Sequence, residues 1–189
     1  MFTGQEHLIG DGLPLRELVD SSSQFSFILW GPPGTGKTTL ARISARLTES
    51  EFHEISAVNA GVADIRKVID SARRVWKSKG KRTVLFIDEI HRFSKSQQDA
   101  VLPHIENGTV RLIGSTTENP SFEVIPALRS RCQTFRLESL GREQVKAILM
   151  RALSDPERGL AKSTLQITDD AMDLIVSHSN GDARRALNV

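Results

Sequence analysis

The feature that most constrains the fold of this chain is a glycine-rich segment that follows a short apolar run. The run, residues 25–30, has the length and composition of a buried strand, and the segment after it fits the phosphate-loop pattern G-x-x-x-x-G-K-[ST] at every specified position. Glycines let the backbone turn tightly and point its N–H groups at phosphate oxygens, and the positive end of the following helix favours the same charge. The pattern predicts a nucleoside triphosphate site, and a glycine-rich turn without a ligand is the alternative. The segment comprises Gly31, Pro32, Pro33, Gly34, Thr35, Gly36, Lys37 and Thr38.

Two side chains of this segment have expected roles of their own. Lys37 would reach the β and γ phosphates of the nucleotide, and Thr38 would hold Mg²⁺. Thr39, the next residue, completes the set that is expected to bind the nucleotide at this end of the sheet.

A second apolar run, residues 83–87, ends in the acidic pair Asp88 and Glu89. Open α/β sheets bind ligands at the carboxyl ends of their strands, so these carboxylates are expected beside the phosphate loop. Asp88 would hold the metal through its water shell, and Glu89 would polarise the attacking water. A helix N-cap followed by an acid in the first turn is the alternative interpretation.

Composition is that of a soluble globular protein. The 189 residues, 39% hydrophobic and 25% charged, suffice for one full core and a small second part. The formal net charge of +2 is too small to imply nucleic acid, so any DNA contact must come from local clustering. The single cysteine, Cys132, excludes an internal disulfide and suits a small buried apolar role in a reducing compartment. Without a signal-like start or an apolar run near ~20 residues, the sequence predicts a cytoplasmic protein.

Apolar runs alternate with amphipathic stretches, which is typical of a doubly wound parallel sheet. One helix is expected to open with a capping box, formed by Ser94 and by Gln97 three residues later. The expected strands are residues 25–30, 51–56, 83–87, 109–114 and 133–137, and the helices between them are residues 38–47, 62–76 and 94–105.

After residue 137 the strand pattern stops and only helical stretches follow. They are expected at residues 142–153, 169–178 and from 182 onward, with a loop at 154–163. We therefore predict an α/β protein, with a five-stranded nucleotide-binding core in residues 1–139 and a helical appendage in residues 140–189. The last predicted helix reaches Val189 without a stop signal, so the natural protein is expected to continue.

Further polar groups lie where a triphosphate site could use them. Thr116 follows the fourth predicted strand and is a candidate sensor of the γ phosphate, although threonine is also an ordinary turn residue. Arg129 and Arg131 precede the last strand, and Arg184 and Arg185 open the final helix. A guanidinium that meets charge on the γ phosphate can be worth roughly 10³ to 10⁵ in rate. The alternative interpretation, from the residues alone, is that each arginine is a solvated charge on the surface.

The ordered set of motifs resembles the AAA+ ATPases, and closely the RarA (MgsA) and Werner-helicase-interacting family of replication-fork ATPases. Residues 31–38 match the family's Walker A motif, and residues 86–93 match its Walker B motif with the flanking residues. Two further stretches, 96–104 and 114–122, match the part that distinguishes this family from its relatives. The resemblance covers essentially the whole chain and implies an AAA+ core followed by a truncated helical lid.

The resemblance also implies roles for the arginines. Residues 130–132, Ser-Arg-Cys, are similar to the arginine-finger motif of clamp loaders, so Arg131 would reach the nucleotide of a neighbouring subunit. Arg129 is the alternative finger. Residues 181–188 are similar to the sensor 2 motif, in which Arg184 would contact the γ phosphate.

The same resemblance assigns Thr116 to sensor 1. Ser56 occupies the position of a polar residue that restrains the catalytic glutamate, here Glu89. The N-terminal segment is similar to the part of the family that packs near the adenine, and the candidates there are Gln5, His7 and Leu8.

As function, the resemblance implies hydrolysis of ATP to ADP and phosphate with Mg²⁺, coupled to replication-fork maintenance, recombination and DNA repair. It implies that the protein binds gapped, forked or duplex-end DNA and fork proteins such as single-stranded-DNA-binding protein. It also implies a homo-tetramer that is located in the cytoplasm at the nucleoid and does not bind a membrane. A clamp-loader subunit and a RuvB-like branch-migration motor are alternatives, and residues 118–122 argue against both. A nucleotide-gated scaffold with little hydrolysis is a further alternative, and the intact Asp88-Glu89 pair weighs against it.

Positive charge is concentrated in residues 66–82. This stretch could neutralise DNA phosphates, and the helix at this place lies near DNA in clamp loaders, whereas a solvated helix face is the alternative. Against the single acid Asp70, the stretch holds Arg66, Lys67, Arg73, Arg74, Lys77, Lys79, Lys81 and Arg82.

Overall fold

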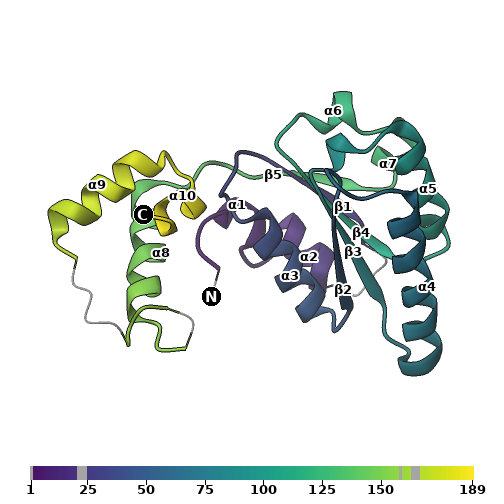
Figure 1. Cartoon of the computed structure of the whole chain (residues 1–189), viewed down its shortest axis with the longest axis horizontal. Helices are drawn as coiled ribbons and strands as arrows, with labels where there is room; N and C mark the ends of the chain where they lie inside the picture. Colours follow the sequence, from purple (N-terminus) through teal and green to yellow (C-terminus); the bar gives the residue numbers. More distant parts are fainter. Residues whose placement is uncertain (1, 21–24, 158, 163–166) are drawn as a thin grey trace. The chain divides into compact units, whose positions relative to one another are not determined.

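The computed structural model describes residues 2–20, 25–157, 159–162 and 167–189. The chain divides into two compact units. We call His7–Gly31 with Lys37–Arg136 the sheet unit, and the residues up to Glu6 with Pro32–Gly36 and Leu137–Val189 the helical unit. Figure 1 shows the elements of each unit, and the two units are described separately below.

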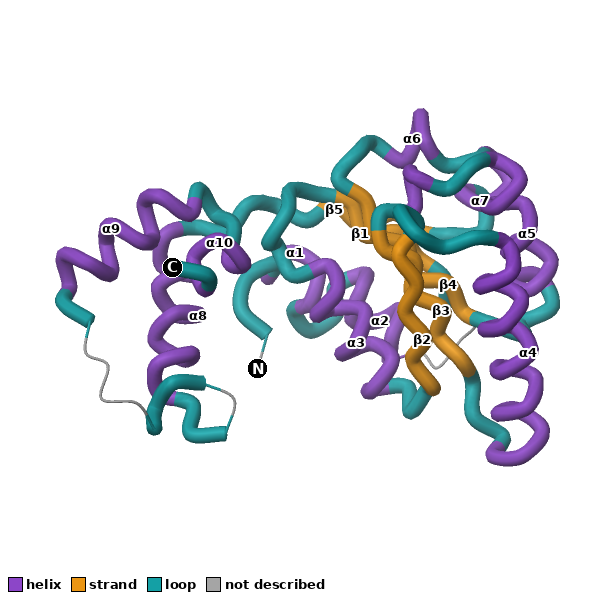
Figure 2. The backbone as a smooth tube through the Cα atoms, viewed as in Figure 1, coloured by secondary structure: helices purple, strands orange, loops and turns teal. Residues whose placement is uncertain are grey.

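The sheet unit contains a five-stranded parallel sheet with the order β2-β3-β4-β1-β5. This arrangement confirms the predicted doubly wound sheet, and Figure 2 shows its strands in orange with helices on either side. Each strand begins and ends within two residues of its predicted bounds. The strands are β1 (Phe27–Trp30), β2 (Glu51–Ser56), β3 (Thr83–Asp88), β4 (Arg111–Thr116) and β5 (Gln133–Arg136).

The largest shift is in β4, which begins and ends two residues later than predicted. The Asn107 side chain accepts hydrogen bonds from the backbone N–H and the hydroxyl of Thr109, at 3.0 and 2.6 Å, and so forms a turn where the strand was expected to start. Thr116 is therefore the last residue of β4 instead of a residue beyond it.

Helices α4 and α5 lie on one face of the sheet, and α2 and α3 lie on the other (Figure 1). The three longer helices occupy the predicted stretches, whereas the short ones were not predicted. The elements are α1 (Glu6–Ile9), α2 (Pro14–Asp20), α3 (Lys37–Leu47), α4 (Val62–Lys79), the 3-10 turn η1 (Ile90–Arg92), α5 (Lys95–Glu106), α6 (Pro120–Glu123) and α7 (Pro126–Arg129).

The predicted capping box opens α5. The Ser94 hydroxyl accepts a hydrogen bond from the backbone N–H of Gln97, and the Gln97 side chain accepts one from the backbone N–H of Ser94 at 2.8 Å. Gln97 also donates to the carbonyl of Ala60 at 3.0 Å, which attaches the start of α5 to the segment before α4.

One hydrophobic cluster of the sheet unit lies between the sheet and the helices α4 and α5. Strands β3 and β4 are buried along almost their whole length, which suits central parallel strands covered on both faces. Ile69 of α4 and Val101 of α5 pack with Leu85, Ile87 and Leu112 of the sheet. Cys132 is buried in the same cluster. This packing holds the carboxyl ends of the central strands in fixed positions.

The helical unit has its own small core, built by α8 (Arg142–Ser154), α9 (Asp169–Ser179) and α10 (Ala183–Leu187). The expectation that the last helix runs to Val189 is wrong, because α10 ends at Leu187 and Asn188 is its C-cap. In the predicted loop 154–163, residues 155–157 and 159–162 are not helical, and 158 and 163 lie outside the described residues. Across the described parts of the chain, none of the helices is both long enough and apolar enough to cross a membrane.

Candidate nucleotide-binding and catalytic site

Gly31 and Lys37, which lie on either side of the inner loop residues 32–36, belong to the sheet unit. The backbone N–H of Gly31 donates to the carbonyl of Thr116 at 3.1 Å, which attaches the end of β1 to the end of β4. Lys37, the first residue of α3, is buried, and its Nζ donates to the Gly31 carbonyl at 2.7 Å. The fold therefore keeps an ammonium group at the carboxyl edge of the sheet, where the motif requires it. Thr38 is partly buried and Thr39 is exposed.

The inner residues of the loop, Pro32–Gly36, group with the helical unit. The Thr35 hydroxyl donates to the Pro32 carbonyl at 2.9 Å, and Gly34 has a φ of +68°, which favours glycine. The backbone N–H of Ala183 donates to the Gly34 carbonyl at 3.2 Å, and a Cβ at Gly34 would clash with Asp182. Residue 34 therefore must be glycine for the N-terminus of α10 to lie against the loop.

Asp88 is the last residue of β3, one residue further than the predicted strand, Glu89 follows it, and a serine on the neighbouring strand contacts both. The Ser115 hydroxyl donates to Oδ1 of Asp88, and the backbone N–H of Glu89 donates to the same hydroxyl at 3.3 Å. Ser115 is completely buried. Sequence analysis gave Ser115 no role, although a run of three hydroxyl residues beside the acidic strand was a signal for one.

Glu89 has a left-handed backbone, with φ 55° and ψ 48°. A non-glycine residue in this region is strained, and such strain is concentrated at functional sites. The Glu89 side chain is 32% exposed, and its Oε2 lies 3.2 Å from Nδ1 of His91. The carboxylate is therefore reachable from solvent while one of its oxygens contacts an imidazole.

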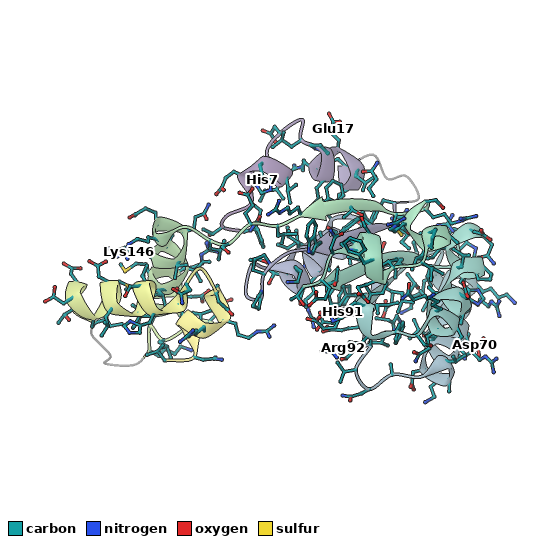
Figure 3. All side chains as sticks on the ribbon, turned by 90° about the horizontal axis from the view of Figure 1, so that it is seen from above. His7, Glu17, Asp70, His91, Arg92 and Lys146 are labelled. Carbon is teal, nitrogen blue, oxygen red and sulfur yellow. The ribbon has the colours of Figure 1, made fainter. Side chains whose placement is uncertain are left out.

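Thr116 lies on the strand next to β3, as its predicted role required. Its side chain is completely buried. The hydroxyl accepts a hydrogen bond from the backbone N–H of Glu118 at 2.9 Å and lies 3.0 Å from Nδ1 of His91. Thr116 thus contacts the segment that carries Glu89 through His91, a residue to which sequence analysis gave no role. Figure 3 labels His91 and its neighbour Arg92.

The residues expected to hold Mg²⁺ fit that ion. Mg²⁺ prefers oxygen ligands and is usually bound by one or two carboxylates together with substrate phosphates. Asp88 supplies a carboxylate whose orientation Ser115 fixes, and Thr38 supplies a hydroxyl at the start of α3. Both residues belong to the sheet unit.

Arg131 lies near the amino ends of the strands, just before β5, whereas Asp88 and Glu89 lie at the carboxyl end of β3. Its guanidinium is 2.5 Å from Oε1 of Glu106 and donates to the carbonyl of Ala127 at 2.8 Å. Arg131 lines a cavity of about 330 Å³ together with Glu106, Arg82 and Arg111. Burial, and then the charge of Arg82, lower the pKa of Arg111.

The structure therefore does not bring Arg131 to the acidic pair of its own chain. Each residue of a parallel strand advances the chain by about 3.3 Å, so the two edges of this sheet are on the order of 13 to 20 Å apart. Arg129 lies before β5 as well and donates to the Ser121 carbonyl at 2.7 Å. Arg184 belongs to α10 of the helical unit.

The residues expected near the adenine have structural partners. The Gln5 amide donates to the carbonyl of Glu138 at 2.7 Å and accepts from its N–H at 2.9 Å, within the helical unit. In the sheet unit, His7 Nε2 lies 3.1 Å from the carbonyl of Arg136, and Leu8 is buried. A contact of these residues with adenine stays a prediction.

Comparison with known proteins places the chain in a family. Residues 27–140 match the family model described as "ATPase family associated with various cellular activities (AAA)". Among solved structures, the Thermotoga maritima RuvB Holliday junction branch migration motor has a TM-score of 0.76 and 31% identity, covering 99% of this chain and 60% of that one.

Curated relatives are more similar in sequence. Replication-associated recombination protein A of Haemophilus influenzae is 50% identical, covering 99% of this chain and 42% of that protein. ATPase WRNIP1 of Dictyostelium discoideum is 48% identical, covering 100% of this chain and 21% of that protein. The chain thus spans less than half the length of these relatives, and the matches confirm the resemblance that the motifs indicated. The chain belongs to the AAA family of ATPases, and over nearly its whole length it is similar to replication-associated recombination proteins.

Proposed function

We propose that this protein is a DNA-associated ATPase that hydrolyses ATP to ADP and phosphate with Mg²⁺, in the service of replication-fork maintenance, recombination and repair. One observation carries the catalytic part of the proposal. Lys37 and the adjacent pair Asp88 and Glu89 come from two distant places in the sequence, and the sheet brings them to the carboxyl ends of its strands, where Ser115 fixes the acidic pair. An ammonium group, a metal-binding carboxylate and a second carboxylate are the groups that phosphoryl transfer to water requires.

Each residue has a distinct task in this mechanism. Lys37 leaves the Gly31 carbonyl and binds the β and γ phosphates, and the loop N–H groups bind the remaining phosphate oxygens. Thr38 and Asp88 would hold Mg²⁺, and the ion, when bound, would neutralise phosphate charge. Glu89 orients a water for in-line attack on the γ phosphorus, and the bond to the β–γ bridging oxygen breaks as ADP leaves.

We further propose that Arg131 acts on the nucleotide of a neighbouring subunit in a homo-oligomer, a tetramer by resemblance. The position of Arg131 at the amino edge of its own sheet supports this, because its own acidic pair lies at the other edge. Arg184 of α10 is proposed as the second arginine that contacts the γ phosphate, with Thr116 as sensor 1.

For DNA, we propose the exposed face of α4 and the loop after it. Arg66, Arg73, Arg74 and Lys77 are all exposed on this helix, so they are available to phosphates. The proposed ligands are gapped, forked or duplex-end DNA, with single-stranded-DNA-binding protein among the partners. The proposed location is the cytoplasm, at the nucleoid.

A RuvB-like branch-migration motor is the second candidate, because the solved RuvB structure covers nearly all of this chain. The sequence favours the first candidate, since identity is 50% to the recombination protein and 31% to RuvB.

The test is the rate of phosphate release by the complete protein with single-stranded, duplex-end, forked and four-way-junction DNA. We expect Mg²⁺-dependent turnover that rises with forked or duplex-end DNA. Stimulation by four-way junctions alone would favour the branch-migration motor. Turnover no higher than that of the Lys37→Ala variant on every DNA would exclude the ATPase.

A further inference from the structure

The nitrogen Nδ1 of His91 contacts two residues that the proposed mechanism uses. It lies 3.2 Å from Oε2 of Glu89 and 3.0 Å from Oγ1 of Thr116. The His91 side chain is only 10% exposed, so neither contact is a loose surface encounter. One ring atom therefore stands between the carboxylate proposed to orient water and the end of β4.

The fold fixes this ring in place. His91 is the middle residue of the 3-10 turn η1, which begins directly after the left-handed Glu89. Ile90 before it is completely buried, and a Cβ at Gly114 of β4 would lie only 3.2 Å from Cδ1 of Ile90. Phe93 after it is buried too. The turn is thus packed against β4 through Ile90 and anchored by the buried Phe93 two residues after His91, which holds the imidazole in place.

Only one of the two contacts can use the hydrogen atom that a neutral imidazole carries. With the hydrogen on Nδ1, the ring donates to Glu89, and the Thr116 hydroxyl is left to donate to the Glu118 carbonyl, 3.1 Å away. With the hydrogen on Nε2, Nδ1 instead accepts from the Thr116 hydroxyl and offers Glu89 no hydrogen bond. The restraint of Glu89 and the orientation of the Thr116 hydroxyl therefore exclude each other.

We propose that His91 is a positioning residue: the hydrogen on Nδ1 holds the Glu89 carboxylate in the orientation that turnover needs, and the ring releases the carboxylate when the Thr116 hydroxyl turns to Nδ1. This inference rests on the proposed hydrolytic function. His91, and not Ser56, is then the residue that contacts the Glu89 side chain, since Ser56 is exposed in this structure. This arrangement also gives the buried Thr116 a route to the reaction that needs no direct contact with phosphate.

The first experiment compares His91→Ala, His91→Asn and His91→Gln in the complete protein. Asparagine places its amide near the position of Nδ1, whereas the glutamine amide reaches the position of Nε2. We expect His91→Ala and His91→Gln to lower kcat at least about 10-fold, with KM for ATP changed less than about 3-fold, and His91→Asn to restore kcat to within about 3-fold of the wild type. Arg92→Ala, an exposed residue of the same turn, is the matched control and should keep basal turnover.

The second measurement is the coupling between His91 and Thr116. If the two residues act as one unit, His91→Ala combined with Thr116→Val lowers kcat no further than the worse single variant does. Independent effects that multiply would overturn the proposal.

The outcomes separate this inference from the proposed function. A wild-type protein without turnover refutes the ATPase itself. A wild-type protein that turns over while His91→Ala and His91→Gln remain within about 3-fold of it refutes only the role of His91. If His91→Ala fails to fold by its melting curve, the comparison of His91→Asn with His91→Gln decides, and equal rates overturn the proposal.

Discussion

The Nη2 atom of Arg131 lies 2.5 Å from Oε1 of Glu106, in an ion pair whose side chains are 39% and 44% exposed. Exposed ion pairs of this kind contribute about 0 to 1 kcal/mol to stability, because water screens the charges. Glu106 therefore orients the guanidinium of Arg131 without locking it, and an anion from another molecule can displace the carboxylate at low cost. We expect Glu106→Gln to change the free energy of unfolding by less than about 1 kcal/mol, measured by urea denaturation. A loss of several kcal/mol would show that the pair is a structural lock.

The proposed action of Arg131 on the nucleotide of a neighbouring subunit has a sharper test. In the complete protein, Arg131→Ala should lower kcat at least about 100-fold and leave ATP binding nearly unchanged, because the guanidinium stabilises charge that develops during transfer. Glu89→Gln protomers keep the arginine and lose their own turnover. Mixing the two inactive variants after dissociation and reassembly should restore part of the activity, measured as phosphate release.

Subunit exchange in these mixtures is verified with differently labelled protomers. If exchanged mixtures stay as inactive as either parent, Arg131 is not the shared residue, and Arg129 or Arg184 must supply the charge. The 189-residue chain is expected to bind ATP yet hydrolyse it slowly wherever it remains a monomer.

Two residues at the carboxyl edge of the sheet should fail in different ways. Lys37→Ala removes a contact to the phosphates of bound ATP, so we expect ATP affinity to fall at least about 10-fold. Glu89→Gln should bind ATP with affinity within about 3-fold of the wild type and lose turnover, because the carboxylate acts in the chemical step. Fluorescent-nucleotide titration and phosphate release measure the two effects separately. Turnover of Glu89→Gln within about 3-fold of the wild type would contradict the assigned role.

The exposed basic face of α4 predicts a change in both affinity and salt dependence. Reversing Arg73, Arg74 and Lys77 to glutamate should weaken DNA binding and flatten the plot of log affinity against log salt, since fewer counterions are released per complex. Fluorescence anisotropy with forked DNA at several salt concentrations measures both. Reversal of Arg16 and Arg46, exposed basic residues of α2 and α3, is the matched control. If the affinity and the slope of the salt plot do not change, the basic face of α4 is solvated and does not bind DNA.

The elements that sequence analysis predicted best depend on local pattern. The apolar runs of β1 and β3 and the capping box of Ser94 with Gln97 are encoded within a few adjacent residues, so they were predictable. The start of β4 was misplaced because Asn107 forms a turn with Thr109 inside a stretch whose composition suits a strand.

The contacts within the site depend on relations that no local pattern contains. Ser115 reaches Asp88 only because the register of β3 and β4 pairs Ile87 with Gly114 and so brings the next residues together. The contact of His91 with Glu89 further requires a left-handed backbone at a glutamate, which sequence patterns do not indicate. The motif residues could therefore be predicted, whereas the residues that orient them could not.

The buried thiol of Cys132 predicts how stability depends on alkaline pH. Burial raises the pKa of Cys132 to about 12, whereas an unfolded chain releases the proton near about 8.5. Above the lower value the unfolded state binds fewer protons than the folded state, so the contribution is complete below pH about 8.5 and is lost as pH rises toward 12. Between pH 7.5 and 9.5, we expect the unfolding free energy of the wild type to fall by about 1 kcal/mol more than that of Cys132→Ala, measured by urea denaturation.

Thiol labelling provides an independent check, because only the thiolate reacts with disulfide reagents. Native protein at pH 8 should react with such a reagent at least about 100-fold more slowly than protein unfolded in urea, since the folded thiol is both protonated and covered. The Cys132→Ala variant shows the background of the reagent, and its melting curve shows whether the core tolerates the smaller side chain. Native labelling at the rate of the unfolded chain, together with equal pH dependence for the two proteins, would mean that Cys132 is accessible and ionises normally.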